Sequence, residues 1–179
     1  GTMTTDTEEL VFGETAIGCV RELGVQIGNS GPGPIDIEAV ASDIEAFEVA
    51  SDTLPKTLEP DEEVSVLVRY APTDEGDHVG LITVTSSDAS DKELEIAATG
   101  TAAFGDWNTE EFTANGTNRV FILGDAVAVQ GTLEVRVSGV LAAGWSFDAS
   151  ANAVVFQEGN APGDGALVKV TYAAVPVCD

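Results

Sequence analysis

Three oxygen-bearing side chains alternate along one short segment of the sequence: Asp148, Ser150 and Asn152. Carboxylate, hydroxyl and amide oxygens at alternate positions are the ligands that calcium-binding loops present. Such loops also place a glutamate at their twelfth position, where this sequence has Gly159. The spacing makes these three residues candidate calcium ligands, and a simple Asx turn between two strands is the competing interpretation.

The chain has a single histidine, His78, which follows an acidic turn and precedes an apolar alternation. A histidine acts as a base or a metal ligand only where other functional side chains converge on it. No G-x-S-x-G motif, phosphate-binding loop or dinucleotide-binding glycine motif is present in the sequence. We therefore predict that His78 is a structural or surface residue and that the chain is not an enzyme. A ligand role and a catalytic role are the alternatives.

Cys19 and Cys178 are the only cysteines, and they lie near opposite ends of the chain. Without a CxxC motif or a Cys/His cluster, a structural zinc site is not expected. The cysteines either form one long-range disulfide or are two separate buried thiols. A disulfide requires the C-terminal segment to fold back onto the first domain, and it would suit an exported protein.

Trp107 and Trp145 are the only tryptophans. On a protein surface they would offer an aromatic platform for a sugar. Trp145 follows Gly144 and precedes Phe147 by two positions, which favours a place in the core. Residues 102–105 are predicted to form a short linker, and we expect Trp107, in this linker region, to pack at the domain junction.

Charge narrows the classes of partner. The chain has 31 acidic and 7 basic residues, giving a net charge of -24. Such a surface repels nucleic acid and anionic lipid, and no apolar run approaches the roughly 20 residues of a membrane-spanning helix. We predict neither nucleic-acid binding nor membrane insertion. The acidity keeps the chain soluble, captures divalent cations weakly or attracts a basic partner.

Short alternations of apolar and polar residues dominate the first part of the sequence. In residues 62–70, the side chains of Val64, Val66, Val68 and Tyr70 fall on one face, which is the period of a half-buried strand. Further strands are predicted at residues 10–12, 19–28, 34–41, 47–50, 79–85 and 92–98. Short strands separated by turn residues favour an immunoglobulin-like antiparallel sandwich.

The remainder of the chain has the same character, with Asn115-Gly116 as a two-residue hairpin signal. Strands are predicted at residues 111–114, 117–123, 132–137, 144–147, 153–156 and 166–173. The sequence therefore predicts an all-β protein with two tandem antiparallel β-sandwich domains, residues 1–101 and 102–179. Gly1-Thr2-Met3 has the composition of a cloning remnant, and a removed signal or anchor would leave no trace.

An ordered series of short motifs spans residues 10–101. It comprises Phe12-Gly13, Gly18, Ile27-Asn29-Gly31, Pro55-Leu58-Pro60, Val68-Tyr70-Pro72-Gly76, Ser87-Asp88 and Gly100-Thr101. The series resembles the ASH/Hydin-like immunoglobulin family, which in bacteria includes the choice-of-anchor D domain. The resemblance implies a fold similar to pilus chaperones and a noncatalytic interaction or spacer module, in bacteria mostly within exported or surface proteins. It carries no binding residues over to this chain.

Residues 102–179 resemble small β-sandwich modules of bacterial surface proteins, a family to which we attach no name or function. The combined expectation is a noncatalytic spacer, scaffold or protein-interaction module that is extracellular, cell-surface or periplasmic. Its partner is another protein or a neighbouring domain of the same chain. The alternative is a calcium-assisted carbohydrate-binding or adhesion module. No cofactor other than calcium is expected.

Overall fold

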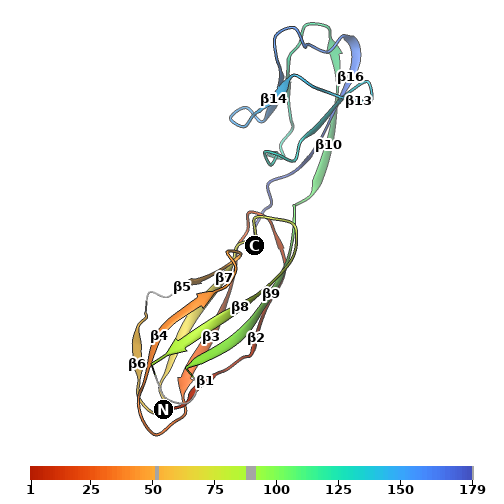
Figure 1. The fold of residues 1–179 in the computed structure, drawn as a ribbon. Coiled ribbons are helices and arrows are strands. Elements are labelled where there is room, and N and C mark those ends of the chain that lie inside the picture. Colours follow the sequence, from red (N-terminus) through yellow and green to blue (C-terminus); the bar gives the residue numbers. More distant parts are fainter. Residues whose placement is uncertain (51–52, 88–91, 179) are drawn as a thin grey trace. The chain divides into compact units, whose positions relative to one another are not determined.

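The structure is a computed structural model that describes residues 1–50, 53–87 and 92–178, all of it strands, turns and loops (Figure 1). The chain divides into two compact units. Unit 1 contains residues 1–103 together with Cys178, and unit 2 contains residues 104–177. The second half of the Ser87-Asp88 motif lies outside the described residues.

Unit 1 is a sandwich of two sheets (Figure 1). Its sheets have the strand orders β1-β3-β7-β5 and β2-β9-β8-β4-β6. The strands are β1 (Met3–Thr5), β2 (Glu9–Ala16), β3 (Arg21–Asn29), β4 (Ile35–Ser42), β5 (Phe47–Ala50), β6 (Lys56–Leu58), β7 (Glu63–Tyr70), β8 (Gly76–Ser86) and β9 (Glu93–Ala103). All the strands predicted for this region are present. β1 and β6 were not predicted, because three residues are too few to show an alternation.

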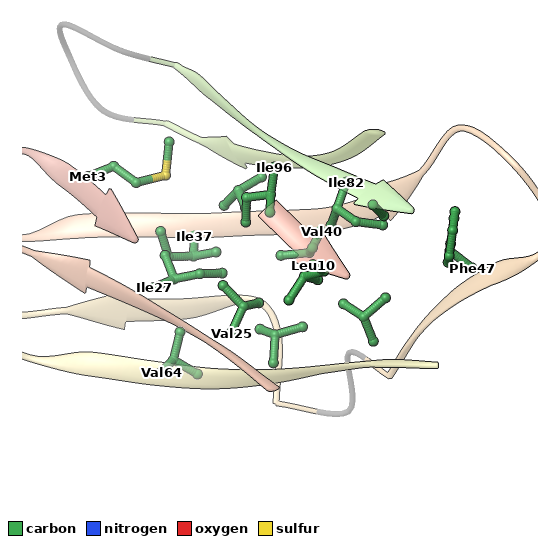
Figure 2. Close-up of a cluster of buried hydrophobic side chains, with 14 of the residues drawn as sticks. Met3, Leu10, Val25, Ile27, Ile37, Val40, Phe47, Val64, Ile82 and Ile96 are labelled. Atoms are coloured by element: carbon green, nitrogen blue, oxygen red, sulfur yellow. The ribbon is translucent and has the colours of Figure 1, made fainter. Parts of the chain in front are cut away.

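The core of unit 1 lies between the two sheets and follows from the alternation in the sequence. Val64, Val66, Val68 and Tyr70 of β7 are buried, whereas the residues between them face outward. Figure 2 shows aliphatic side chains from both sheets meeting in this cluster. Full burial of each such side chain contributes about 1.5–3 kcal/mol to the stability of the fold. The apolar face of each strand is therefore the one directed toward the core.

The antiparallel prediction is wrong for one pair, because β2 runs parallel to β9, with Leu10 opposite Ala98. A parallel pair needs a long connection, and the strands between β2 and β9 supply one. β1 pairs antiparallel with β3, so the N-terminal segment contributes to both sheets. Met3 is buried in this arrangement, and the residues that resemble a cloning remnant are therefore part of the fold.

Unit 2 also has two sheets, with the orders β10-β16-β12-β13 and β11-β15-β14. The strands are β10 (Trp107–Asn115), β11 (Val120–Ile122), β12 (Glu134–Val137), β13 (Val140–Leu141), β14 (Trp145–Asp148), β15 (Ala153–Phe156) and β16 (Asp164–Ala173). Between these sheets lies a second core that includes Phe121, Val135, Phe156, Val168 and Tyr172.

The hairpin predicted at Asn115-Gly116 is not formed. Oδ1 of Asn115 accepts hydrogen bonds from the backbone N of Thr117 (3.1 Å) and Asn118 (2.7 Å). β11, the next strand, joins the other sheet instead of pairing with β10. Asn115 thus forms an Asx turn in the connection from one sheet to the other. The Asn-Gly dipeptide alone does not distinguish such a turn from a hairpin.

Candidate functional site

One side of unit 1 presents a strand edge from each sheet. β5 pairs with β7 and with no second strand among the described residues. β4 pairs with β6 only over Ile35–Ile37, so its later residues pair with β8 alone. Residues of both edges line one open groove of about 740 Å³. Two strand edges thus contribute to the walls of this groove.

The groove has an apolar floor. Val40 and Phe47 are buried, and Figure 2 places both among the core side chains. Ile44, Ala46 and Val49 are half-buried along the same lining. Apolar side chains that are only partly covered leave area for a partner to bury.

A tight turn holds the groove against β8. Oδ1 of Asp43 accepts a hydrogen bond from the backbone N of Leu81 at 2.7 Å. The hydroxyl of Ser42 donates to the carbonyl O of Ile44 at 2.9 Å, which closes the turn locally. A Cβ on Gly80 would lie 2.8 Å from Oδ1 of Asp43, so this close approach requires glycine in β8. The strands predicted at residues 34–41 and 47–50 flank this turn, and their pattern did not indicate a groove.

The charge along the groove has a single sign. The carboxylates of Asp43, Glu45 and Glu48 line it, and no lysine, arginine or histidine is among its lining residues. Arg69, which lies opposite Glu48 in the β5–β7 register, pairs with Glu22 through Nε at 2.6 Å. The site therefore favours positively charged side chains over negatively charged ones.

A second exposed surface lies on the outer face of the five-stranded sheet. Val11 (61% exposed) and Val79 (70% exposed) both lie opposite Thr99 on adjacent strands. Leu81, also on the outer face, is 38% exposed. Val11 also lines a smaller groove of about 440 Å³ together with Val20 and Leu23.

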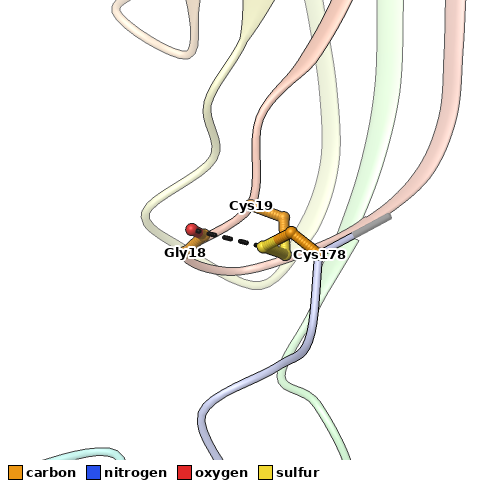
Figure 3. The surroundings of a disulfide bond; sticks show 3 residues. All are labelled: Gly18, Cys19 and Cys178. Carbon is orange, nitrogen blue, oxygen red and sulfur yellow. Dashed lines mark hydrogen bonds between the residues drawn. A yellow bond between two sulfur atoms is a disulfide. The ribbon is translucent and has the colours of Figure 1, made fainter.

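The two cysteines are joined by a disulfide within unit 1 (Figure 3). Their Cα atoms are 5.5 Å apart, and 159 positions separate them in the sequence. Sγ of Cys178 lies 3.8 Å from the carbonyl O of Gly18, a van der Waals contact because a disulfide sulfur carries no hydrogen. The chain thus passes between the two units at two peptide bonds, Ala103–Phe104 and Val177–Cys178.

His78 contacts the buried side chain of Tyr70. Its Nδ1 lies 2.7 Å from Oη of Tyr70, and the two rings meet edge to face. Burial, and secondarily the negative charge of Asp77, raises the pKa of Tyr70. A neutral phenol that is hydrogen-bonded to the imidazole anchors the start of β8.

The candidate calcium ligands do not converge. Oδ1 of Asp148 accepts hydrogen bonds from the hydroxyl of Ser150 (2.7 Å), the backbone N of Ser150 (3.0 Å) and that of Ala151 (3.2 Å). These bonds, the one from the Ser150 hydroxyl above all, lower the pKa of Asp148.

The amide of Asn152 faces a different loop. Its Nδ2 donates to the carbonyl O of Gly124 (3.2 Å) and Ala126 (3.0 Å), and its Oδ1 accepts from the backbone N of Ala128 (3.0 Å). Asp148 and Ser150 thus form an Asx turn, while Asn152 tethers a neighbouring loop. Within the described ranges, no group of three His, Cys, Asp or Glu side chains is placed to hold a metal ion.

The two tryptophans have different surroundings. Trp145 packs against the core of unit 2 and donates from Nε1 to the carbonyl O of Ala142 at 3.1 Å. Trp107 does not lie in a linker but begins β10, where it is 58% exposed and meets the ring of Phe104 edge to face. In the part of the chain that the structure describes, no helix is long and apolar enough to cross a membrane.

The chain is similar to known proteins in its first unit. The model of the family described as "ASH: Abnormal spindle-like microcephaly-assoc'd, ASPM-SPD-2-Hydin" matches residues 2–94, a little over half of the chain. No curated protein matches the chain.

Several solved structures are similar to this chain. The ASH/PapD-like domain 7 of human CEP192 has 15% identity and a TM-score of 0.48, covering 56% of this chain and 84% of that one. A protein of unknown function from Porphyromonas gingivalis W83 has 17% identity and a TM-score of 0.50, covering 56% of this chain and 46% of that one. The secreted serine protease VesC from Vibrio cholerae has 9% identity and a TM-score of 0.42, covering 92% of this chain and 45% of that one. At these identities the likeness concerns the fold alone.

Proposed function

The chain belongs to the ASH family, and from this premise we propose that it is a noncatalytic protein-interaction module of an exported or cell-surface bacterial protein. The observation that carries the proposal is the groove between the open edges of β4 and β5. Strand edges present backbone groups that can form hydrogen bonds, and the apolar floor can bury apolar side chains of a partner. Together they suit the binding of an extended protein segment.

The disulfide supports the exported location. Disulfides form and persist in oxidising compartments, whereas cytosolic thiols are kept reduced. Cys19 and Cys178 are the only cysteines of the chain, and both are used in this one bond. We therefore propose that the module works in the periplasm, at the cell surface or outside the cell.

Site-specific photocrosslinking tests the interaction function. A photoreactive amino acid replaces Glu45 in the groove, Glu95 on the outer face of β9, or Glu111 on β10 of unit 2; all three side chains are exposed. We expect protein adducts, formed in cells of the natural host, from the Glu45 position and fewer from the other two. If none of the positions yields an adduct, the chain is a spacer and the interaction function is wrong.

Carbohydrate binding is a second candidate, and one observation favours it. Trp107 exposes more than half of its surface on the outer face of β10, and Thr109 follows on the same face. Stacking of sugars on such a ring would change tryptophan fluorescence during titration with oligosaccharides. Trp107→Ala should abolish the change, whereas Leu141→Ala, at a similarly exposed apolar residue of the same sheet, should leave it intact. An unchanged emission spectrum in the wild type eliminates this candidate.

A further inference from the structure

We infer that the groove accepts an extended basic segment of another protein, which adds as a strand to β5 and alternates apolar side chains with lysine or arginine. The inference rests on the proposed interaction function and names the chemistry of the partner. Three features support it: the outward direction of backbone groups of β5, the apolar floor of the groove, and the carboxylates of Asp43, Glu45 and Glu48, which form its rim.

The backbone of β5 offers hydrogen-bonding groups on its outer side. The backbone N of Ala71 in the β7–β8 connection donates to the carbonyl O of Ala46 at 2.9 Å, whereas the N of Phe47 donates to the O of Ile44 at 3.3 Å, away from β7. Backbone groups alternate in direction along an antiparallel strand, so those of Val49 also point away from β7. A partner strand is therefore positioned to pair at Val49.

The side chains of such a strand would alternate between two environments. One set would face the floor formed by Val40, Phe47 and Val49, where apolar groups become buried. The other set would face outward, toward the rim. β5 has 4 residues, about 13 Å of strand at roughly 3.3 Å per residue, so the paired stretch is short and charge attraction supplements it.

The rim selects the charge of the occupant. Asp43, Glu45 and Glu48 carry the carboxylates of the groove, and no cationic side chain lines it. The whole chain has a net charge of -24, so a second copy of it is repelled from this edge. The negative charge therefore disfavours pairing between copies of the chain, and it attracts a segment rich in lysine or arginine.

Binding of synthetic peptides to the full chain tests the inference. The probe is a fluorescent peptide of about ten residues that alternates valine with lysine, long enough to span β5. One control peptide alternates proline with lysine, which keeps the charge but cannot pair as a strand. A second control alternates valine with glutamate. Binding is followed by fluorescence anisotropy at low and at physiological salt.

Three protein variants separate charge from strand pairing. Glu45→Gln with Glu48→Gln removes two rim carboxylates, and Glu93→Gln with Glu95→Gln removes two on β9, outside the groove. Val49→Pro removes an N–H that points away from β7, so it blocks a partner while retaining the β5–β7 pairs. Circular dichroism of each variant establishes that it is folded.

We expect the valine–lysine peptide to bind at least about fivefold more weakly to the rim variant, given roughly 1 kcal/mol for each close charge pair near water. The β9 variant should bind it as the wild type does, and Val49→Pro should abolish binding. Equal binding of the proline–lysine peptide overturns the inference, since charge alone would then explain it. Equal binding of the valine–lysine peptide to the rim variant and the β9 variant also overturns the inference, since the rim carboxylates would then play no part. Photocrosslinks that arise from other faces would still uphold the proposed interaction function, so the two failures are distinguishable.

Discussion

Oδ1 of Asp43 accepts a hydrogen bond of 2.7 Å from the backbone N of Leu81, which ties the turn before β5 to the strand β8 of the opposite sheet. The bond determines where the groove floor lies, because Ile44 and Phe47 follow within the same turn and also approach Gly80 closely. The exposed residue Asp43 thus positions Ile44 and Phe47 on the inner side of the turn.

Replacement of Asp43 should separate this positioning role from charge. Asp43→Asn retains the Oδ1 acceptor, so we expect unit 1 to keep its stability within a few tenths of a kcal/mol. Asp43→Ala removes the acceptor and should cost about 1 kcal/mol, the usual net contribution of one hydrogen bond. Chemical denaturation followed by far-UV circular dichroism measures both. Equal losses for the two variants would show that the carboxylate charge, rather than the hydrogen bond, holds the turn.

Reduction of the disulfide should destabilise unit 1. The bond closes a loop of 159 positions, and cross-links over long loops stabilise domains by about 2–4 kcal/mol through the unfolded state. Cys19→Ser with Cys178→Ser, or reductant on the wild type, should lower the melting temperature of unit 1. Tryptophan fluorescence should detect little change in unit 2, since Trp107 and Trp145 both lie there. Reductant added to the double variant is the control and should have no effect.

The fold of unit 1 was largely predictable because its strands are long enough to alternate. β7 shows four buried positions in eight residues, and this regularity fixes both the strand and its inner face. The order of the sheets and the parallel pairing of β2 with β9 were not predictable, since they depend on contacts between distant segments. The cysteines posed a similar problem: their spacing left two arrangements open, and only the folded chain places them 5.5 Å apart at Cα.

The groove was not predictable, and its residues explain why. Asp43, Glu45 and Glu48 read as solvent-facing acids in a chain that has 31 of them. Their common location depends on how Gly80 admits the turn, which is a tertiary contact. The spacing of Asp148, Ser150 and Asn152, in contrast, suggested a shared site, yet a positive φ of 47° at Asn152 turns its amide toward another loop.

Tyr172 should make unit 2 sensitive to alkaline pH. Its burial, together with a 2.6 Å hydrogen bond to Glu110 and the charge of that carboxylate, raises the pKa of Tyr172 to about 12. The unfolded phenol titrates near pH 10, so between about pH 10 and 12 the unfolded chain loses the proton first. The stabilisation is fully present below pH 10 and is lost as the pH rises through 12.

Denaturation at a series of pH values, followed by tryptophan fluorescence, measures this loss. Tyr172→Phe should lower stability at neutral pH by about 1.5–3 kcal/mol, because a hydrogen bond to a charged group is removed. Its stability should then fall less steeply than that of the wild type above pH 10. Parallel curves for the two proteins would indicate that Tyr172 does not titrate differently in the folded and unfolded states.

Cations should stabilise the chain through screening rather than through a calcium site. A net charge of -24 creates self-repulsion that dissolved ions reduce, whichever cation supplies the ionic strength. Asp148 already accepts three hydrogen bonds within its turn, and Asn152 is engaged with a separate loop. We expect sodium chloride and calcium chloride at matched ionic strength to raise the melting temperature equally, with no change on adding EDTA. A larger increase with calcium that Asp148→Asn abolishes and Asp164→Asn preserves would instead establish a specific site, because a ligand of the folded state stabilises it by mass action.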